Sequence, residues 1–159
     1  MVSYSRFRPG MSRLDPYRVD WLDPDGTVSK GAAIAVPVVK LSVAEQDAFF
    51  AREDAARGPA APPQAAAARA FAREQLPPVI PPHQAQGLVA ASDGRLLLRR
   101  FETKDFPAPR YDVVDRRSQL VGVLALDKGE RIVGFGPKSV YVAWKDADDI
   151  ERLRRHPWP

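Results

Sequence analysis

The segment that decides the fold reads Gly87-Leu-Val-Ala-Ala-Ser-Asp-Gly-Arg-Leu-Leu-Leu-Arg-Arg-Phe101. Two apolar runs flank Ser92-Asp-Gly94, and a short Asp-Gly turn between such runs is a strong signal for a β-hairpin. The segment therefore predicts two antiparallel strands, over residues 87–91 and 95–101.

The same pattern continues to the end of the chain. Turns at residues 116–118, 136–138 and 145–149 separate further apolar runs. The strands predicted from them cover 109–115, 119–126, 131–135, 139–144 and 150–155. Seven short strands at regular spacing predict an antiparallel meander of propeller-blade type, as two to three blades or partial blades, in a mainly β protein.

An earlier hairpin is predicted in the N-terminal region. Residues 17–22 alternate apolar and polar side chains, Asp23-Pro-Asp-Gly26 is a tight-turn sequence, and residues 27–30 form the return strand. Residues 34–41 are expected to be extended, and Pro37 favours an edge position there.

The middle of the chain predicts a helical insert. Ser42-Val-Ala-Glu45 is a capping box, in which Ser42 accepts from the helix and Glu45 reaches back. We predict helices over 43–57 and 65–75, separated by a proline-rich break. Residues 76–82 are a polyproline-like spacer, with a ligand for a proline-binding domain as the alternative. The chain thus divides into residues 1–41, 42–82 and 83–159.

Composition excludes several classes of site. The chain of 159 residues has no cysteine, which excludes disulfides, thiolate metal sites and a cysteine nucleophile. The net charge is +4, with arginines scattered along the chain, so a solvated surface is favoured over a nucleic-acid site. The arginines that such a site would use are Arg99, Arg100, Arg116, Arg117, Arg152, Arg154 and Arg155.

Targeting signals are not evident in the sequence. No apolar run approaches the ~20 residues of a membrane span, and residues 1–9 lack the apolar region of a signal peptide. As written, the chain is expected to stay in the cytoplasm.

Few residues point to chemistry. His83 and His156 lie beside prolines and are expected at the surface rather than in a metal site. The acidic cluster at residues 146–151 lacks the glycine of a calcium loop and is interpreted as a polar turn. Gly134-Phe-Gly136 is interpreted as a turn between strands. We therefore expect no catalytic, cofactor-binding or metal-binding residues, and no cofactor.

Two pairs of carboxylates and the large aromatic residues complete the candidates. Asp112 with Asp115, and Asp20 with Asp23, could act as acid–base pairs, but alternation favours the wet face or turn caps. The aromatic side chains could stack a sugar or a base. We instead expect Trp21 and Trp144 between sheets, and at least one of Phe49 and Phe50 in the core. Trp158, Tyr111 and Tyr141 are further candidates for such stacking.

The C-terminal half resembles the last blades of bacterial six-bladed β-propeller proteins of the NHL-like kind. The residues that carry the resemblance are Leu76-Pro77, Ser92-Asp-Gly-Arg95, Tyr111-Asp-Val-Val-Asp115, Leu120-Val-Gly122, Ile132-Val-Gly-Phe-Gly136 and Tyr141-Val-Ala-Trp-Lys-Asp146. Residues 17–26 resemble the outer hairpin of an earlier blade. These motifs are structural, and the resemblance implies a truncated relative or a fragment whose full-length relatives are exported.

A partial propeller has a physical consequence. A terminal blade without a neighbour exposes an apolar sheet face and an unpaired edge strand. We expect the chain either to self-associate or bind a protein partner through that face, or to cover it with the two helices. An interaction module is therefore the first functional hypothesis. A remnant of a ligand-binding or hydrolytic propeller enzyme is the second, and a basic nucleic-acid-binding surface is the third.

Overall fold

The protein is described by a computed structural model over residues 2–4, 17–37, 39–57 and 65–158. It is mainly β, with antiparallel sheets and two helices, an arrangement consistent with partial blades. The predicted fold class is thereby confirmed.

The middle sheet is a four-stranded antiparallel meander in the order β6-β7-β8-β9. Its strands are β6 (His83–Ala90), β7 (Leu96–Arg100), β8 (Arg110–Val114) and β9 (Leu120–Ala125). Gly94 closes the first turn with a φ of 85°, a left-handed conformation that glycine adopts without strain. The hairpin predicted around residues 92–94 is confirmed.

The C-terminal sheet is a three-stranded meander in the order β10-β11-β12. It contains β10 (Arg131–Gly136), β11 (Ser139–Lys145) and β12 (Glu151–Pro157). Gly134-Phe-Gly136 ends β10, and the pairing with β11 shifts between Ile132 and Gly134. The interpretation of these glycines as a turn is therefore wrong, because the turn follows at Pro137 and Lys138.

The N-terminal sheet has the order β1-β2-β3. The predicted hairpin is present as β2 (Val19–Leu22) and β3 (Val28–Ser29), and β1 (Val2–Tyr4) adds a strand that the sequence pattern did not predict. Residues 34–41 are less regular than expected. A bridge joins Tyr17 to Ile34, and the strand β4 covers only Val39–Lys40.

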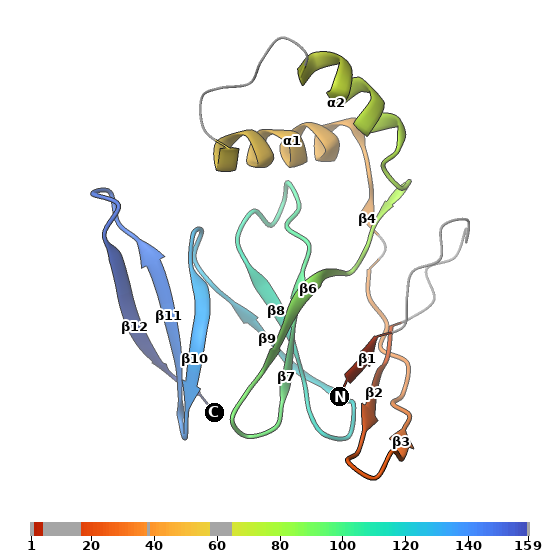
Figure 1. The fold of residues 1–159 in the computed structure, drawn as a ribbon, viewed down its shortest axis with the longest axis vertical. Coiled ribbons are helices and arrows are strands. Elements are labelled where there is room, and N and C mark those ends of the chain that lie inside the picture. Colours follow the sequence, from red (N-terminus) through yellow and green to blue (C-terminus); the bar gives the residue numbers. More distant parts are fainter. Residues whose placement is uncertain (1, 5–16, 38, 58–64, 159) are drawn as a thin grey trace.

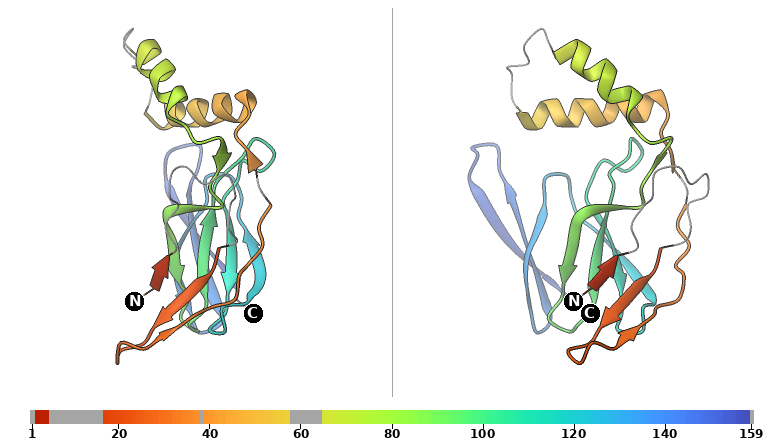
Figure 2. Two further views of the ribbon diagram at one scale, coloured as in Figure 1. Left: turned by 90° about the vertical axis from the view of Figure 1, so that its right-hand side faces the viewer. Right: turned by 45° about the vertical axis from the view of Figure 1, so that its right-hand side comes forward.

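The sheets pack face to face, and the core lies between them (Figures 1 and 2). One buried cluster joins the middle and C-terminal sheets and includes Leu97, Val113 and Val142. A second cluster joins the middle sheet to the N-terminal region and includes Val19 and Val114. Alternate residues of the middle sheet thus face two different neighbours, which explains why its strands are apolar on both faces.

Both predicted helices are present, as α1 (Val43–Arg57) and α2 (Ala65–Glu74). A two-stranded ribbon connects the helices to the sheets. In this ribbon, β4 pairs with β5 (Val79–Ile80). The spacer expected over residues 76–82 therefore contains a short strand. Figures 1 and 2 show both helices above one end of the strands, and neither helix covers a sheet face.

The start of α1 departs from the predicted capping box. Ser42 Oγ accepts a hydrogen bond from the Glu45 amide at 3.2 Å, as expected. The Glu45 carboxylate does not reach back, because it accepts the backbone amide of Lys104 at 2.9 and 3.0 Å. The first turn of α1 is thereby attached to the loop between β7 and β8.

Candidate functional site

A charged cluster is buried where the N-terminal region meets the middle sheet. The Asp112 side chain is fully buried, and its carboxylate accepts hydrogen bonds from three other side chains. Tyr17 Oη donates to Oδ2 over 3.1 Å, and His83 Nε2 lies 2.8 Å from the same oxygen. Arg100 Nε donates to Oδ1 over 2.7 Å. All the partners that this buried carboxylate needs are thus supplied by residues far apart in the sequence.

Sheet register brings these residues together. His83 begins β6 opposite Arg100, which ends β7. Asp112 lies in β8 opposite Leu98, on the same face as Val114. Tyr17 enters from the bridge with Ile34, and its ring contacts the His83 ring edge-on with centroids 4.4 Å apart.

Hydrogen bonding decides the charge of the cluster. Burial acts to raise the pKa of Asp112, but the hydrogen bonds from His83 and Arg100 outweigh it, and the pKa is lowered from its usual 3.8. Asp112 is therefore a carboxylate at neutral pH, and it accepts from all three donors.

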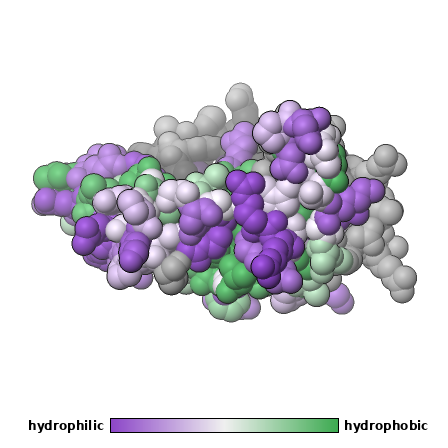
Figure 3. Space-filling model, turned by 90° about the horizontal axis from the view of Figure 1, so that it is seen from below, coloured by the Kyte–Doolittle hydropathy of each residue, from purple (hydrophilic) through white to green (hydrophobic). Residues whose placement is uncertain are grey.

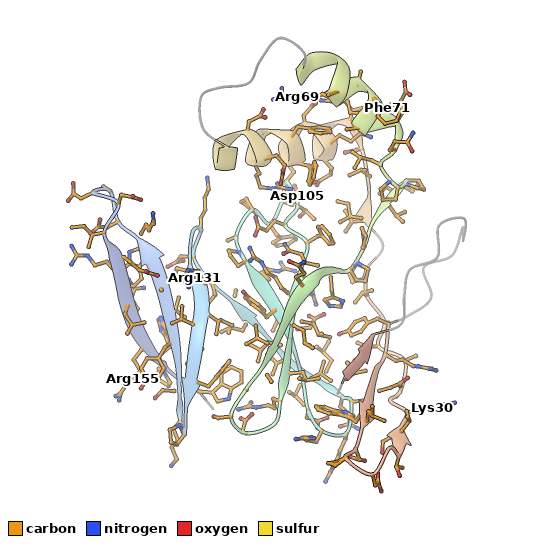
Figure 4. All side chains as sticks on the ribbon, viewed as in Figure 1. Lys30, Arg69, Phe71, Asp105, Arg131 and Arg155 are labelled. Atoms are coloured by element: carbon orange, nitrogen blue, oxygen red, sulfur yellow. The ribbon has the colours of Figure 1, made fainter. Side chains whose placement is uncertain are left out.

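A cavity of about 160 Å³ adjoins the cluster at the base of the helices. Arg100 belongs both to its wall and to the buried cluster. Most of the wall is apolar, and Figure 4 shows Asp105 on the loop beneath α1. The wall is formed by Val36, Pro37, Val39, Glu45, Ile80, Pro81, Pro82, Arg100, Phe101, Thr103, Asp105, Phe106, Ala108 and Arg110.

The outer face of the C-terminal sheet is a second candidate site. Val140 and Val142 on the inner face of β11 are 1% and 0% exposed, whereas Leu153 of β12 is 64% exposed. Leu153 pairs with Ala143, so it lies on the face opposite to Val142. No sheet covers this face among the described residues.

Two predictions about this region are wrong. His83 is 4% exposed rather than at the surface, and Asp112 is 0% exposed rather than on the wet face. Asp115 does cap a turn, since its Oδ1 accepts the amides of Arg117 and Gln119. Tyr17 and Arg100 were not linked to Asp112 by sequence reasoning. The available signal was one charged residue, Asp112, between Tyr111 and Val113 in the interior of β8.

The other acidic candidates have structural roles. Asp20 accepts the Gly31 amide at 3.0 Å, and the backbone of Asp23 closes the β2–β3 turn. Asp146 Oδ1 accepts the amides of Asp148 and Ile150, which confirms the polar turn before β12. Among the residues that the structure describes, no group of three acidic or histidine side chains could hold a metal ion.

The aromatic residues follow the prediction in part. Trp21 packs against the second buried cluster, as expected. Trp144 lies outside both clusters, beneath the Arg154 guanidinium at 4.5 Å, whereas Trp158 is 7% exposed in the first cluster. Phe49 and Phe50 contact each other and belong to neither buried cluster, so the expected core position is wrong. Tyr111 is buried in the first cluster, and Tyr141 and His156 are half-buried on the C-terminal sheet.

The arginines proposed for nucleic acid do not gather on one face. Arg99 pairs with Glu102, Arg152 with Asp146 and Arg154 with Glu130. Arg116 stacks over Trp21 of the N-terminal sheet, whereas Arg155 lies on β12 of the C-terminal sheet.

No helix among the described residues is long and apolar enough to cross a membrane. No protein-family model, no curated protein and no solved structure matches this chain.

Proposed function

We propose that the chain is a structural interaction module that binds a second copy of itself head to tail. In this arrangement the outer face of the C-terminal sheet of one copy packs on the outer face of the N-terminal sheet of the other. The observation that carries the proposal is the 64% exposure of Leu153 on a face whose reverse side packs Val140 and Val142 into the first buried cluster. An unpartnered sheet face leaves such an exposed apolar side chain available to a partner.

The N-terminal sheet offers a matching surface. Val19 and Trp21 point into the second buried cluster, so Asp20 and Leu22 lie on the opposite face of β2. Val28 pairs with Leu22 and is 51% exposed. Each terminal sheet thus presents apolar side chains on the face that points away from the middle sheet.

Most charges of the two faces have partners within the chain. Register places Arg131, Lys145 and Arg155 on the outer face of the C-terminal sheet, together with Glu151. The N-terminal sheet carries Asp20 on its outer face, and Asp23 and Asp25 lie in the adjoining turn, near Arg18 and Lys30. Figure 4 shows Arg155 and Lys30 at opposite sides of the molecule. Arg131 pairs with Glu151, Lys145 with Asp149, and Arg18 with Asp20. We therefore attribute the association to the exposed apolar side chains rather than to charge.

Symmetry limits the assembly. An interface between two different faces leads either to a closed ring or to an open filament. The three large sheets of one chain fan out in Figure 1, and propeller rings contain about four to eight such sheets. Two copies would supply six, so we propose a closed ring of two chains.

The test is the mass in solution of the full chain by light scattering after size exclusion. One chain has a mass of 17.6 kDa, and the proposal predicts a species of about twice that mass. Leu153→Asp and Val28→Asp should each shift the population to the monomer, because each buries an unpaired charge in the interface. Leu120→Asp on the edge strand β9, where Leu120 is 39% exposed, is the matched control and should leave the mass unchanged.

Mixing the two variants tests the orientation. A Leu153→Asp chain keeps an intact N-terminal face, and a Val28→Asp chain keeps an intact C-terminal face. Their mixture should therefore recover a dimer with one intact interface, which two like faces could not do. A monomeric wild-type chain, or equal loss with Leu120→Asp, would refute the proposed function.

A further inference from the structure

The cavity beside the buried cluster has the features of a small-molecule site, and these are independent of the outer sheet faces. Its volume is about 160 Å³. For comparison, a dry protein cavity of ~150 Å³ lined by apolar side chains accommodates a benzene molecule. Val36, Val39, Ile80, Phe101 and Phe106 provide the apolar part of the wall. The space therefore suits an apolar group of about five or six carbon atoms.

Two arginines, Arg100 and Arg110, belong to this wall. The β7–β8 register ends at the pair of Arg99 and Tyr111; continued by one step, it would bring Arg100 opposite Arg110 on the same face of the middle sheet. Like charges directly opposite each other on a sheet are destabilising. Asp112 already offsets the charge of Arg100, so an anion bound between the two guanidinium groups would mainly neutralise Arg110.

The two guanidinium groups differ in how they are held. Arg100 uses Nε and one terminal nitrogen on Asp112 Oδ1, at 2.7 and 2.5 Å. This bond to a buried carboxylate fixes the plane of the group and leaves its other N–H donors unused by Asp112, since guanidinium has five. Asp112 is thus a positioning residue for Arg100.

Arg110 is held by an aromatic ring. Its guanidinium carbon lies 3.8 Å from the centre of the Phe106 ring, and it has no ion pair among the described residues. A guanidinium stacked in this way keeps its N–H donors at the ring edge available for a carboxylate.

The carboxylates near the cavity have other partners. Both oxygens of Glu45 accept the Lys104 amide, and the residue is 7% exposed. The Asp105 side chain is 75% exposed and lies 3.9 Å from Lys104 Nζ. Neither one forms an ion pair with Arg110 among the described residues, so a ligand carboxylate would not displace a wall carboxylate from that guanidinium.

We propose that this cavity binds a small monocarboxylate with a branched or aromatic apolar body. The carboxylate is held between Arg100 and Arg110, and the apolar body lies against Val39, Ile80 and Phe101. Arginine is suited to this task because its planar donors match the two oxygens of a carboxylate.

The test is a titration of the full chain with 3-methylbutanoate, followed by amide chemical shifts in NMR spectra. Shifts should move at Ile80 and over residues 100–110. The neutral 3-methylbutanamide has the same shape and should bind about tenfold more weakly or worse, because it lacks the charge that strengthens both hydrogen bonds. Binding of the amide, or of 3-methylbutan-1-amine, as tight as that of the acid would overturn the carboxylate assignment.

Two variants with matched controls locate the site. Arg110→Gln should weaken 3-methylbutanoate by about tenfold, whereas Arg154→Gln, which also removes an arginine stacked on an aromatic ring, should have no effect. Val39→Phe fills the cavity and should abolish binding, while Val133→Phe on β10 should not. If 3-methylbutanoate causes no shifts, or if Arg110→Gln and Val39→Phe bind it like the wild type, the proposal is wrong. Neither result bears on the mass of the assembly, so this site and the proposed function fail separately.

Discussion

Asp112 is the residue at which the N-terminal region and three strands of the middle sheet meet. A carboxylate without partners would not remain ionised at full burial, because removing it from water costs several kcal/mol. Tyr17, His83 and Arg100 compensate for that loss. The same bonds connect the packing of the sheets with the orientation of Arg100 at the cavity.

Removing this carboxylate should destabilise the fold severely. Asp112→Ala leaves buried donors without an acceptor, and we expect the free energy of unfolding to fall by about 3 kcal/mol or more. Asp115→Ala, which removes a carboxylate from an exposed turn, should cost about 1 kcal/mol. Urea unfolding of both variants gives the comparison, and equal losses would contradict the role assigned to Asp112.

Acid should weaken the ion pair between Asp93 and Arg95. The Arg95 side chain lowers the pKa of Asp93 from 3.8 to about 2, and Asp93 Oδ2 also accepts from Trp158 Nε1 at 2.8 Å. Because the folded-state pKa is depressed, this contribution is complete above pH 4 and is lost as the pH falls toward 2. The side chain is 36% exposed, so screening limits the effect to about 1 kcal/mol.

The check is urea unfolding at pH 5 and pH 2.5. The stability difference between wild type and Asp93→Asn should shrink at the lower pH. A difference that stays constant between the two pH values would rule out this source of acid sensitivity.

At the scale of elements, the N-terminal sheet is attached to the turn between β8 and β9. Ser118 Oγ donates to the Val19 carbonyl over 2.7 Å and accepts from Trp21 Nε1 over 3.1 Å. Gly31 passes so close that a Cβ atom there would collide with the Val19 carbonyl oxygen and the Ser118 side chain. The absence of a side chain at this position is what permits the approach.

Gly31→Ala should therefore loosen that attachment. We expect a loss of about 2 kcal/mol in the free energy of unfolding, in the range typical of overpacking. Gly122→Ala on β9 is the control, since a Cβ atom there would meet nothing within 4 Å. Thermal or urea unfolding separates the two variants, and a tolerated Gly31→Ala would show that the segment can shift at little cost.

Elements set by local pattern could be predicted from the sequence, and their long-range partners could not. The β6–β7 hairpin and α1 follow from turn and capping residues a few positions apart. The Glu45 carboxylate instead bonds to Lys104, 59 residues away, and His83 bonds to Asp112, 29 residues away. The repeats of helices and strands span only a few residues, so they cannot predict contacts between residues this far apart in the sequence. The buried cluster and the cavity therefore form only when the sheets pack together.

At the scale of the whole molecule, the middle sheet is the only large sheet in the described part of the chain that is packed on both faces. Leu96, Leu97 and Leu98 of β7 are 3%, 0% and 4% exposed. We expect their amides to exchange hydrogen most slowly, near the rate of global unfolding, because β7 is also paired on both sides. Native-state exchange should show faster exchange for β12, which has one strand neighbour, and the reverse order would contradict this hierarchy of stability.

The long-range bonds of the N-terminal sheet also determine when it can fold during synthesis. Tyr17 is separated from Asp112 by 95 residues, and Trp21 from Ser118 by 97. A ribosome that adds about 5–20 residues per second needs several seconds to make that interval. Until then the first hairpin has no sheet to pack against, and isolated hairpins are marginally stable in water. The earliest part of this chain to be made is therefore among the last to fold, and it is exposed to chaperones and proteases in the meantime.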